Sequence, residues 1–119
     1  MNINPEIKVH EDDNGKIYKV DYTLLIQGRQ KGDSFLARCS VLNAIGFSEK
    51  NQIAAFGDLT DNLDLFFKIH AERGTLKTAL VALGWKKRND NSNYISDVLV
   101  RSLFEEKKYS GSVEVKQAA

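Results

Sequence analysis

A change in hydrophobic period after residue 50 constrains the fold of this chain more than any other feature. Apolar residues alternate with polar ones over residues 17–27 and 34–41, which predicts two strands that each bury one face and pair as an antiparallel hairpin. From Ile53 to His70 the apolar residues recur mostly at steps of three and four, which predicts one amphipathic helix. Strands followed by a long helix favour an α+β fold, with the helix packed on the sheet.

Weaker patterns place further strands around this hairpin. A short apolar alternation predicts an edge strand near residues 6–10, with a flexible tail as the alternative, and Asn14-Gly15 favours a tight turn after it. The hairpin is expected to turn over residues 28–33, whose glycines suit a loop. Residues 43–48 predict a third strand, which would continue the chain as a β-meander.

The second half of the chain carries signals for helix ends. Gly57 lies within the long helix, where the absence of a side chain would allow the helix backbone to approach the sheet. Gly74 fits the C-terminal cap of this helix, and Thr75 fits the N-cap of a short second helix that Gly84 would end. Trp85 is expected to fold back onto the core.

Residues 86–93 predict a polar connector, which would be followed by a third short helix from Ser96 or Asp97 and, beyond Gly111, by a strand over residues 112–116. We therefore expect an antiparallel sheet of three to four strands packed by one long amphipathic helix, with one or two short helices and a C-terminal strand. Residues 1–119 would form a single domain. Within it, 1–14 are a polar N-terminal extension, and 86–119 comprise the connector, the short helix and the final strand.

Composition limits the function classes. The chain has 119 residues, of which 28% are charged, and its 17 Lys and Arg residues nearly balance its 16 Asp and Glu residues. This size and balance indicate one soluble domain and disfavour a globally basic nucleic-acid-binding protein. Cys39 is the single cysteine, so no intrachain disulfide and no cysteine-based zinc site can form. With no apolar run near the ~20 residues of a membrane span and no secretory pattern at the start, we expect a cytoplasmic protein with no membrane partner.

Catalytic chemistry is not expected, and neither is a metal nor a cofactor. His10 lies in the polar N-terminal segment, and His70 lies in the last turn of the long helix, where a capping or packing role is the simpler interpretation. Cys39 falls on the apolar side of a strand, with nothing evident in the sequence to activate its thiol. We therefore predict a protein that is not an enzyme.

Two groups of charged residues are candidate interaction sites. Asp58, Asp61 and Asp64 follow one another at steps of three along the long helix, where they could hold Mg²⁺ or form a plain solvated face. A locally basic group could contact RNA, DNA or an acidic partner, or form a solvated loop. Its members are Arg73, Lys77, Lys86, Lys87, Arg88 and Arg101.

Short motifs follow one another between Tyr18 and Trp85. They are, in chain order, Tyr22-Thr23-Leu24-Leu25-Ile26, Gly32-Asp33, Phe35-Leu36-Ala37-Arg38-Cys39, Ala55-Phe56-Gly57-Asp58-Leu59, Leu65-Phe66-Phe67, Glu72-Arg73-Gly74-Thr75-Leu76 and Leu83-Gly84-Trp85. In these motifs and their order the stretch resembles the HicB-like antitoxin family. The chain departs from the family where Ser40 stands in place of the usual Pro, and over residues 48–53 before the helix. Residues 86–119 are too short, and wrongly patterned, for the C-terminal DNA-binding segment that family members often carry, which argues against DNA binding.

The resemblance implies a fold akin to a partial ribonuclease H without its active site, assembled as a dimer or tetramer, often with paired or exchanged strands. It implies a protein that binds a small, basic HicA-type toxin and prevents this toxin from cleaving mRNA. Charge complementarity makes Asp58, Asp61 and Asp64 the candidate toxin contacts. The alternatives are a nucleic-acid-binding regulatory protein that uses the basic group, and an orphan HicB-like oligomer without a toxin.

Overall fold

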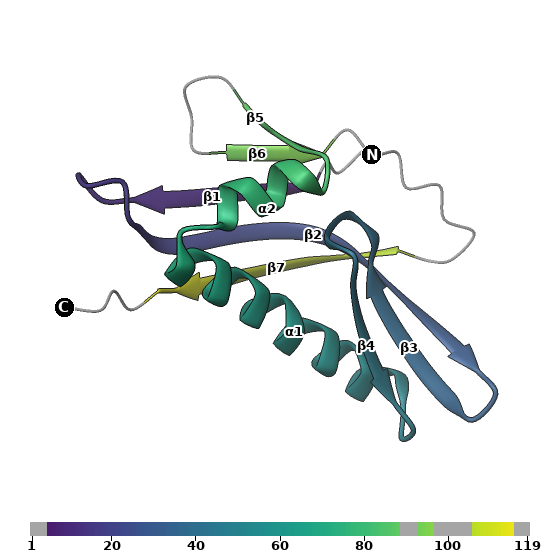
Figure 1. The fold of residues 1–119 in the computed structure, drawn as a ribbon. Helices are drawn as coiled ribbons and strands as arrows, with labels where there is room; N and C mark the ends of the chain where they lie inside the picture. Colours follow the sequence, from purple (N-terminus) through teal and green to yellow (C-terminus); the bar gives the residue numbers. More distant parts are fainter. Residues whose placement is uncertain (1–4, 89–92, 97–105, 116–119) are drawn as a thin grey trace.

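A computed structural model describes residues 5–88, 93–96 and 106–115 (Figure 1). In these residues seven strands form one antiparallel sheet, and two α-helices lie against one side of it. The expected α+β class, with a long helix, a short helix and a C-terminal strand, is confirmed. The sheet is larger than expected, and the elements are β1 (Glu6–Glu11), β2 (Ile17–Lys31), β3 (Ser34–Cys39), a 3-10 helix (Ser40–Leu42), β4 (Ala44–Ser48), α1 (Gln52–Arg73), α2 (Leu76–Ala82), β5 (Trp85–Lys87), β6 (Asn93–Ser96) and β7 (Glu106–Glu114).

Strand β2 is the centre of the sheet because it pairs with three other strands. Its first half lies between β1 and β7, and its last residues pair with β3. The sequence predicts a turn from residue 28, but β2 continues to Lys31 and only Gly32-Asp33 turn the chain, with Gly32 at φ 61°. Gly28 is a strand residue, and a Cβ there would stand 2.7 Å from the side chain of Gln52 at the start of α1, which would have to shift.

The sheet extends past β1, where the sequence predicts an edge. Strand β1 pairs with β2 on one side and with β6 on the other, so it is an interior strand. Strands β5 and β6 pair as a hairpin, so the predicted polar connector over residues 86–93 is wrong at both of its ends. Strand β6 is held by a strand from the opposite end of the chain, a partner that no local pattern reveals.

Helix α1 begins after its N-cap Asn51, whose side-chain oxygen accepts a hydrogen bond from the Ala54 N–H at 2.7 Å. It ends at Gly74, which has φ 70° and confirms the expected cap. Its buried stripe differs from the predicted face at Ile53, which is 83% exposed in the first turn. The residues that face the sheet recur every four positions and are Ala55, Leu59, Leu63, Phe67 and Ala71.

The close approach between α1 and the sheet is made by a glycine of the sheet. A Cβ on Gly57 would meet no atom within 4 Å, so the prediction that Gly57 allows this approach is wrong. Gly46 in β4 lies directly under α1, where a Cβ would stand 2.4 Å from the Ala55 carbonyl oxygen and from the Leu59 nitrogen. Gly46 therefore sets how closely β4 and α1 pack.

Helix α2 and Trp85 close the other end of the core. The side chains of Leu76 and Leu80 are buried as predicted. Thr75 occupies the predicted N-cap position of α2, but its hydroxyl bonds to His70 in the last turn of α1 and not to a backbone N–H of α2. Trp85 is 2% exposed, and its Nε1 donates a hydrogen bond to the Val41 carbonyl oxygen at 2.8 Å. The expected return of Trp85 to the core is confirmed, and the indole ties the segment after α2 to the chain after β3.

Strand β7 runs through Gly111, where the sequence predicts a break before a strand over residues 112–116. The aromatic ring of Tyr22 lies over Gly111, and a Cβ on this glycine would stand 2.4 Å from Tyr22 Cζ. Gly111 therefore makes room for a core side chain, and β7 is nine residues long. The third helix predicted from Ser96 or Asp97 falls on residues 97–105, outside the described residues, and Ser96 itself ends β6.

Candidate functional site

The three aspartates expected to form one acidic row lie on different sides of α1. Asp58 points toward β4, where its Oδ2 accepts a hydrogen bond from the Phe47 N–H at 2.9 Å. Asp64 points toward β2, where its Oδ1 accepts a hydrogen bond from the Tyr22 hydroxyl at 2.5 Å. Asp61 lies between them on the helix surface and is exposed. Because two of these carboxylates hold the helix to the sheet, only Asp61 is wholly offered to a partner.

An outer stripe of α1, made of Asp61, Leu65 and Glu72, faces away from the sheet. Residues four and seven apart on a helix share a face, so these three side chains follow one line along α1. Leu65 is 53% exposed, and both acidic residues are exposed. Lys68, which is seven residues from Asp61 and four from Glu72, lies on the same face and is also exposed, so two carboxylates stand against one ammonium group. The stripe thus combines an exposed apolar side chain with a net negative charge. The sequence does not predict the exposure of Leu65, because most apolar residues of the helix pattern are buried.

The predicted basic group lies mostly around α2 and β5, which pack against each other. Arg73 ends α1, Lys86 and Lys87 lie in β5, and Arg88 follows β5; all four are exposed. Successive strand residues point to opposite faces of a sheet, so Lys86 and Lys87 do not share one surface. The sixth member, Arg101, lies outside the described residues.

Lys77 of α2 is tied to the sheet by an ion pair. Its ammonium group contacts the carboxylate of Glu11 at the end of β1. The hydrogen bond to Glu11 raises the pKa of Lys77, which therefore stays charged at neutral pH but has part of its charge compensated. Lys77 contributes less to a phosphate-binding surface than its position in the basic group suggests.

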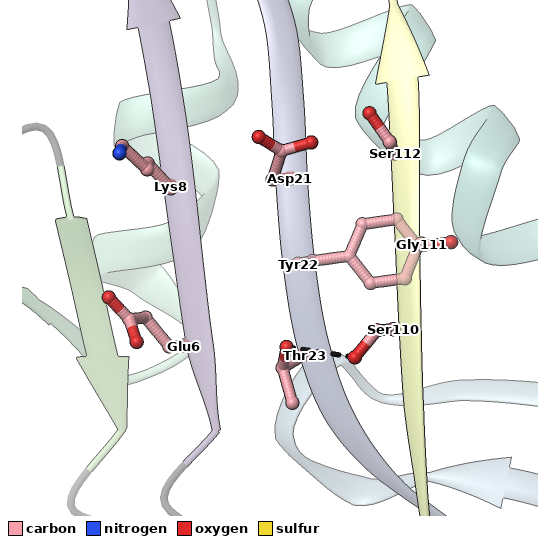
Figure 2. Close-up of a pocket in the computed structure, with 8 residues that line it drawn as sticks. All are labelled: Glu6, Lys8, Asp21, Tyr22, Thr23, Ser110, Gly111 and Ser112. Carbon is pink, nitrogen blue, oxygen red and sulfur yellow. Dashed lines mark hydrogen bonds between the residues drawn. The ribbon is translucent and has the colours of Figure 1, made fainter.

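A polar trough crosses the sheet on the side away from α1 (Figure 2). It has a volume of about 510 Å³ and is lined by two rows of side chains that follow the register of β1, β2 and β7. One row is Glu6, Thr23 and Ser110, in which the two hydroxyl oxygens lie 3.1 Å apart. The other row is Lys8, Asp21 and Ser112. The alternation over residues 17–27 implies an exposed polar face, but only the pairing of distant strands brings these rows together.

Asp21 joins the trough to His10 in a small hydrogen-bonded network. The imidazole Nε2 of His10 lies 2.8 Å from the Asp21 carboxylate. Hydrogen bonds from Ser112 and from His10 lower the pKa of the Asp21 carboxyl group. The carboxylate therefore lies between the hydroxyl and the imidazole, whereas activation of a serine nucleophile requires the imidazole in the middle. This network binds the strands to one another without assembling a catalytic triad.

The remaining candidate groups have structural surroundings. Cys39 is fully buried, and burial raises the pKa of its thiol to about 11, so the thiol is protonated at neutral pH. The His70 Nδ1 lies 2.8 Å from the Thr75 hydroxyl oxygen and the ring packs on Phe66, which confirms the capping and packing interpretation. Among the described residues, no cluster of three or more His, Cys, Asp or Glu side chains could hold a metal ion. Neither helix of the described segments is long and apolar enough to cross a membrane.

No protein-family model, no curated protein and no solved structure matches this chain. The likeness to HicB-like antitoxins therefore stays a prediction from the motifs quoted above. The fold shows which of those motifs lie close to one another, for example where Trp85 bonds to the chain just after Cys39.

Proposed function

We propose that this protein is a non-enzymatic HicB-like antitoxin, which binds a small HicA-type toxin and covers the site at which the toxin cleaves mRNA. The packing of the family-like motifs against each other carries this proposal. The indole of Trp85, in Leu83-Gly84-Trp85, donates its hydrogen bond to Val41, two residues after the Cys39 that ends another motif. Motifs that are individually weak thus form one core in the chain order that the resemblance implies.

The outer stripe of α1 is the proposed contact surface. A toxin that cleaves mRNA needs a basic surface to hold phosphates, and acidic side chains complement such a surface. Asp61 and Glu72 provide exposed carboxylates, and Leu65 between them provides an apolar anchor. Asp58 adds negative charge at the β4 side of the stripe while its carboxylate stays bonded to Phe47.

The proposal is tested by purifying the tagged protein from its host, identifying what co-purifies, and assaying the purified partner for mRNA cleavage. We expect a small basic protein whose cleavage activity is inhibited at a stoichiometric ratio. Asp61→Lys should weaken binding about tenfold, because it replaces an attraction by a repulsion at the contact. Asp13→Lys, an equal charge change in the exposed turn after β1, is the matched control.

Two results would separate the parts of this proposal. If no ribonuclease co-purifies under conditions that preserve complexes, the antitoxin function is rejected and an orphan oligomer is favoured. If inhibition is seen but Asp61→Lys binds as tightly as the wild type, the antitoxin function stands and the contact surface is elsewhere.

A nucleic-acid-binding regulatory protein is the second candidate, and the exposed cations Arg73, Lys87 and Arg88 favour it. Binding to phosphates would weaken steeply as salt is added, because bound cations release counterions. Titration of RNA and of duplex DNA at low and high salt decides this point. Absence of binding at low salt removes the candidate.

A further inference from the structure

The polar trough on the side of the sheet away from α1 has the lining of a binding site (Figure 2). It has a volume of about 510 Å³, and short side chains form its floor, because Thr23, Ser110 and Ser112 carry their hydroxyl groups close to the backbone. The longer side chains of Glu6 and Lys8 line it on the β1 side. In the described part of the chain neither of these two charged groups takes part in an ion pair. Both are therefore available to a ligand.

A β-bulge brings an exposed aromatic ring to one end of the trough. The pairing of β1 with β2 shifts between His10 and Glu11, so that Tyr18 is the extra residue on β2. Tyr18 is 47% exposed, and its ring centroid lies 6.0 Å from the centroid of the His10 ring. The His10 imidazole lies 2.8 Å from the carboxylate of Asp21, which lines the trough. The Tyr18 ring therefore borders the trough, where strict alternation along β2 would place it on the buried face.

The lining of the trough suits a neutral ligand with many hydroxyl groups. A phosphate would meet the carboxylates of Glu6 and Asp21 as well as the ammonium group of Lys8. A metal ion would lack ligands, because no cluster of three His, Cys, Asp or Glu side chains lies among the described residues. An apolar ligand would leave the hydroxyl groups of the floor without hydrogen-bond partners. A polyhydroxylated ligand both donates and accepts hydrogen bonds, as the serine and threonine hydroxyls of the floor do.

We propose that the trough binds a neutral oligosaccharide, with one sugar ring stacked on Tyr18 and the hydroxyl groups of the following sugars bonded to Asp21 and Lys8. The face of a sheet binds oligosaccharides in other small β-rich folds. Residues 18 and 21 lie about 10 Å apart along a strand, which is longer than one sugar ring, so the ligand is a chain of sugars. Hydrogen bonds from Ser112 and His10 lower the pKa of Asp21, which therefore accepts hydrogen bonds as a carboxylate at neutral pH. The inference goes beyond the antitoxin proposal and does not depend on it.

NMR titrations with maltohexaose, cellopentaose and penta-N-acetylchitopentaose as separate probes test the proposal. We expect at least one of them to shift the amide signals of β1, β2 and β7 around the trough, and to saturate with a dissociation constant on the order of 1 mM. Inorganic phosphate is the control for an anion site. Absence of these shifts with all three sugars, or a stronger response to phosphate than to any sugar, would overturn the proposal.

Variants of the two ends of the trough test the assignment of the residues. Tyr18→Ala should weaken binding of the responding sugar by about tenfold, whereas Tyr18→Phe keeps the ring and should bind within about twofold of the wild type. Phe47→Ala removes a ring that is also 47% exposed, on β4, and is the matched control. Ser110→Gln places a longer side chain on the floor, at an exposed position that does not alter the core, and should also weaken binding by about tenfold. Unchanged affinity in Tyr18→Ala or in Ser110→Gln, or an equal loss in Phe47→Ala, would contradict binding in the trough.

Discussion

Two of the edge strands of the described sheet, β4 and β7, differ in how the backbone groups on their outer sides are bonded. In β4 the Phe47 N–H donates to Asp58, and the Ile45 carbonyl oxygen accepts a hydrogen bond from the Asn62 side chain at 2.8 Å. Both side chains come from α1, so one helix closes a strand of five residues. Strand β7 has nine residues, and within the described part of the chain no strand pairs with its outer edge.

This difference shows that an acidic side chain on a helix can bond to the backbone of the sheet, and that such a residue need not contact a partner. An open strand edge is a template for unwanted association, and polar side chains that satisfy its backbone groups remove that hazard. Asp58 and Asn62 do this for β4, which leaves β7 as the longer edge offered for pairing. A sequence reading in which Asp58 only contacts a partner overlooks its bond to the sheet.

The packing of β4 under α1 gives the largest expected effect. Gly46→Val should destabilise the fold by about 3 kcal/mol or more, because its side chain would displace the backbone of α1 at Ala55 and Leu59. Gly57→Ala is the contrasting variant and should stabilise the protein by about 0.5–1 kcal/mol, since it meets no neighbouring atom and favours the helix. Urea denaturation measures both. Equal effects of the two substitutions would show that Gly46 does not hold α1 close to β4.

Removal of the closure of β4 should have an intermediate effect. The double variant Asp58→Ala, Asn62→Ala should lose about 2 kcal/mol of folding free energy, because two backbone groups lose their partners. It should also associate as its concentration rises, because the outer edge of β4 is then open. Light scattering and urea denaturation test this pair of outcomes, with Asp61→Ala as the control. A double variant as stable and as monodisperse as the control would mean that these bonds do not protect the edge.

The bond between Tyr22 and Asp64 should have the smallest effect at neutral pH and a distinct pH dependence. Tyr22→Phe should cost about 1 kcal/mol near pH 7. Burial and the Asp64 carboxylate raise the pKa of the Tyr22 phenol in the folded protein, while the phenol of the unfolded chain ionises near pH 10. The stability that Tyr22 provides is therefore complete below pH 10 and falls as the pH rises above it. Urea midpoints at pH 8 and pH 10.5 should show a larger loss for the wild type than for Tyr22→Phe; equal losses would contradict this assignment.

The regular elements of the fold were predictable where the pattern is local. The alternation around Val20 and Leu24 predicts β2, and the spacing of Leu59 and Leu63 predicts α1, because one buried face imposes its period on the sequence. Gly74 marks the C-terminal end of α1 by chemistry that involves only neighbouring residues. These predictions need no knowledge of the tertiary structure.

The errors arise where a distant segment determines a residue's role. Gly111 is a strand residue because Tyr22 lies over it, and Gly46 is required because α1 lies over it. The hairpin of β5 and β6 depends on β1, and its first strand has only three residues, two of them lysines. In the candidate site, the charge of Asp61 is visible in the sequence, whereas the bonds of Asp58 and Asp64 are made with residues of other elements.

Amide hydrogen exchange, followed by NMR over a range of protein concentrations, tests the contrast between the two edges most directly. The Phe47 N–H, bonded to Asp58, should exchange slowly at every concentration. The Val115 N–H bonds to the Tyr18 carbonyl oxygen, so the Ser112 N–H points away from β2 and should exchange rapidly at low concentration. A Ser112 N–H that exchanges as slowly as the Phe47 N–H at low concentration, or a rapidly exchanging Phe47 N–H, would contradict the account of one closed and one open edge.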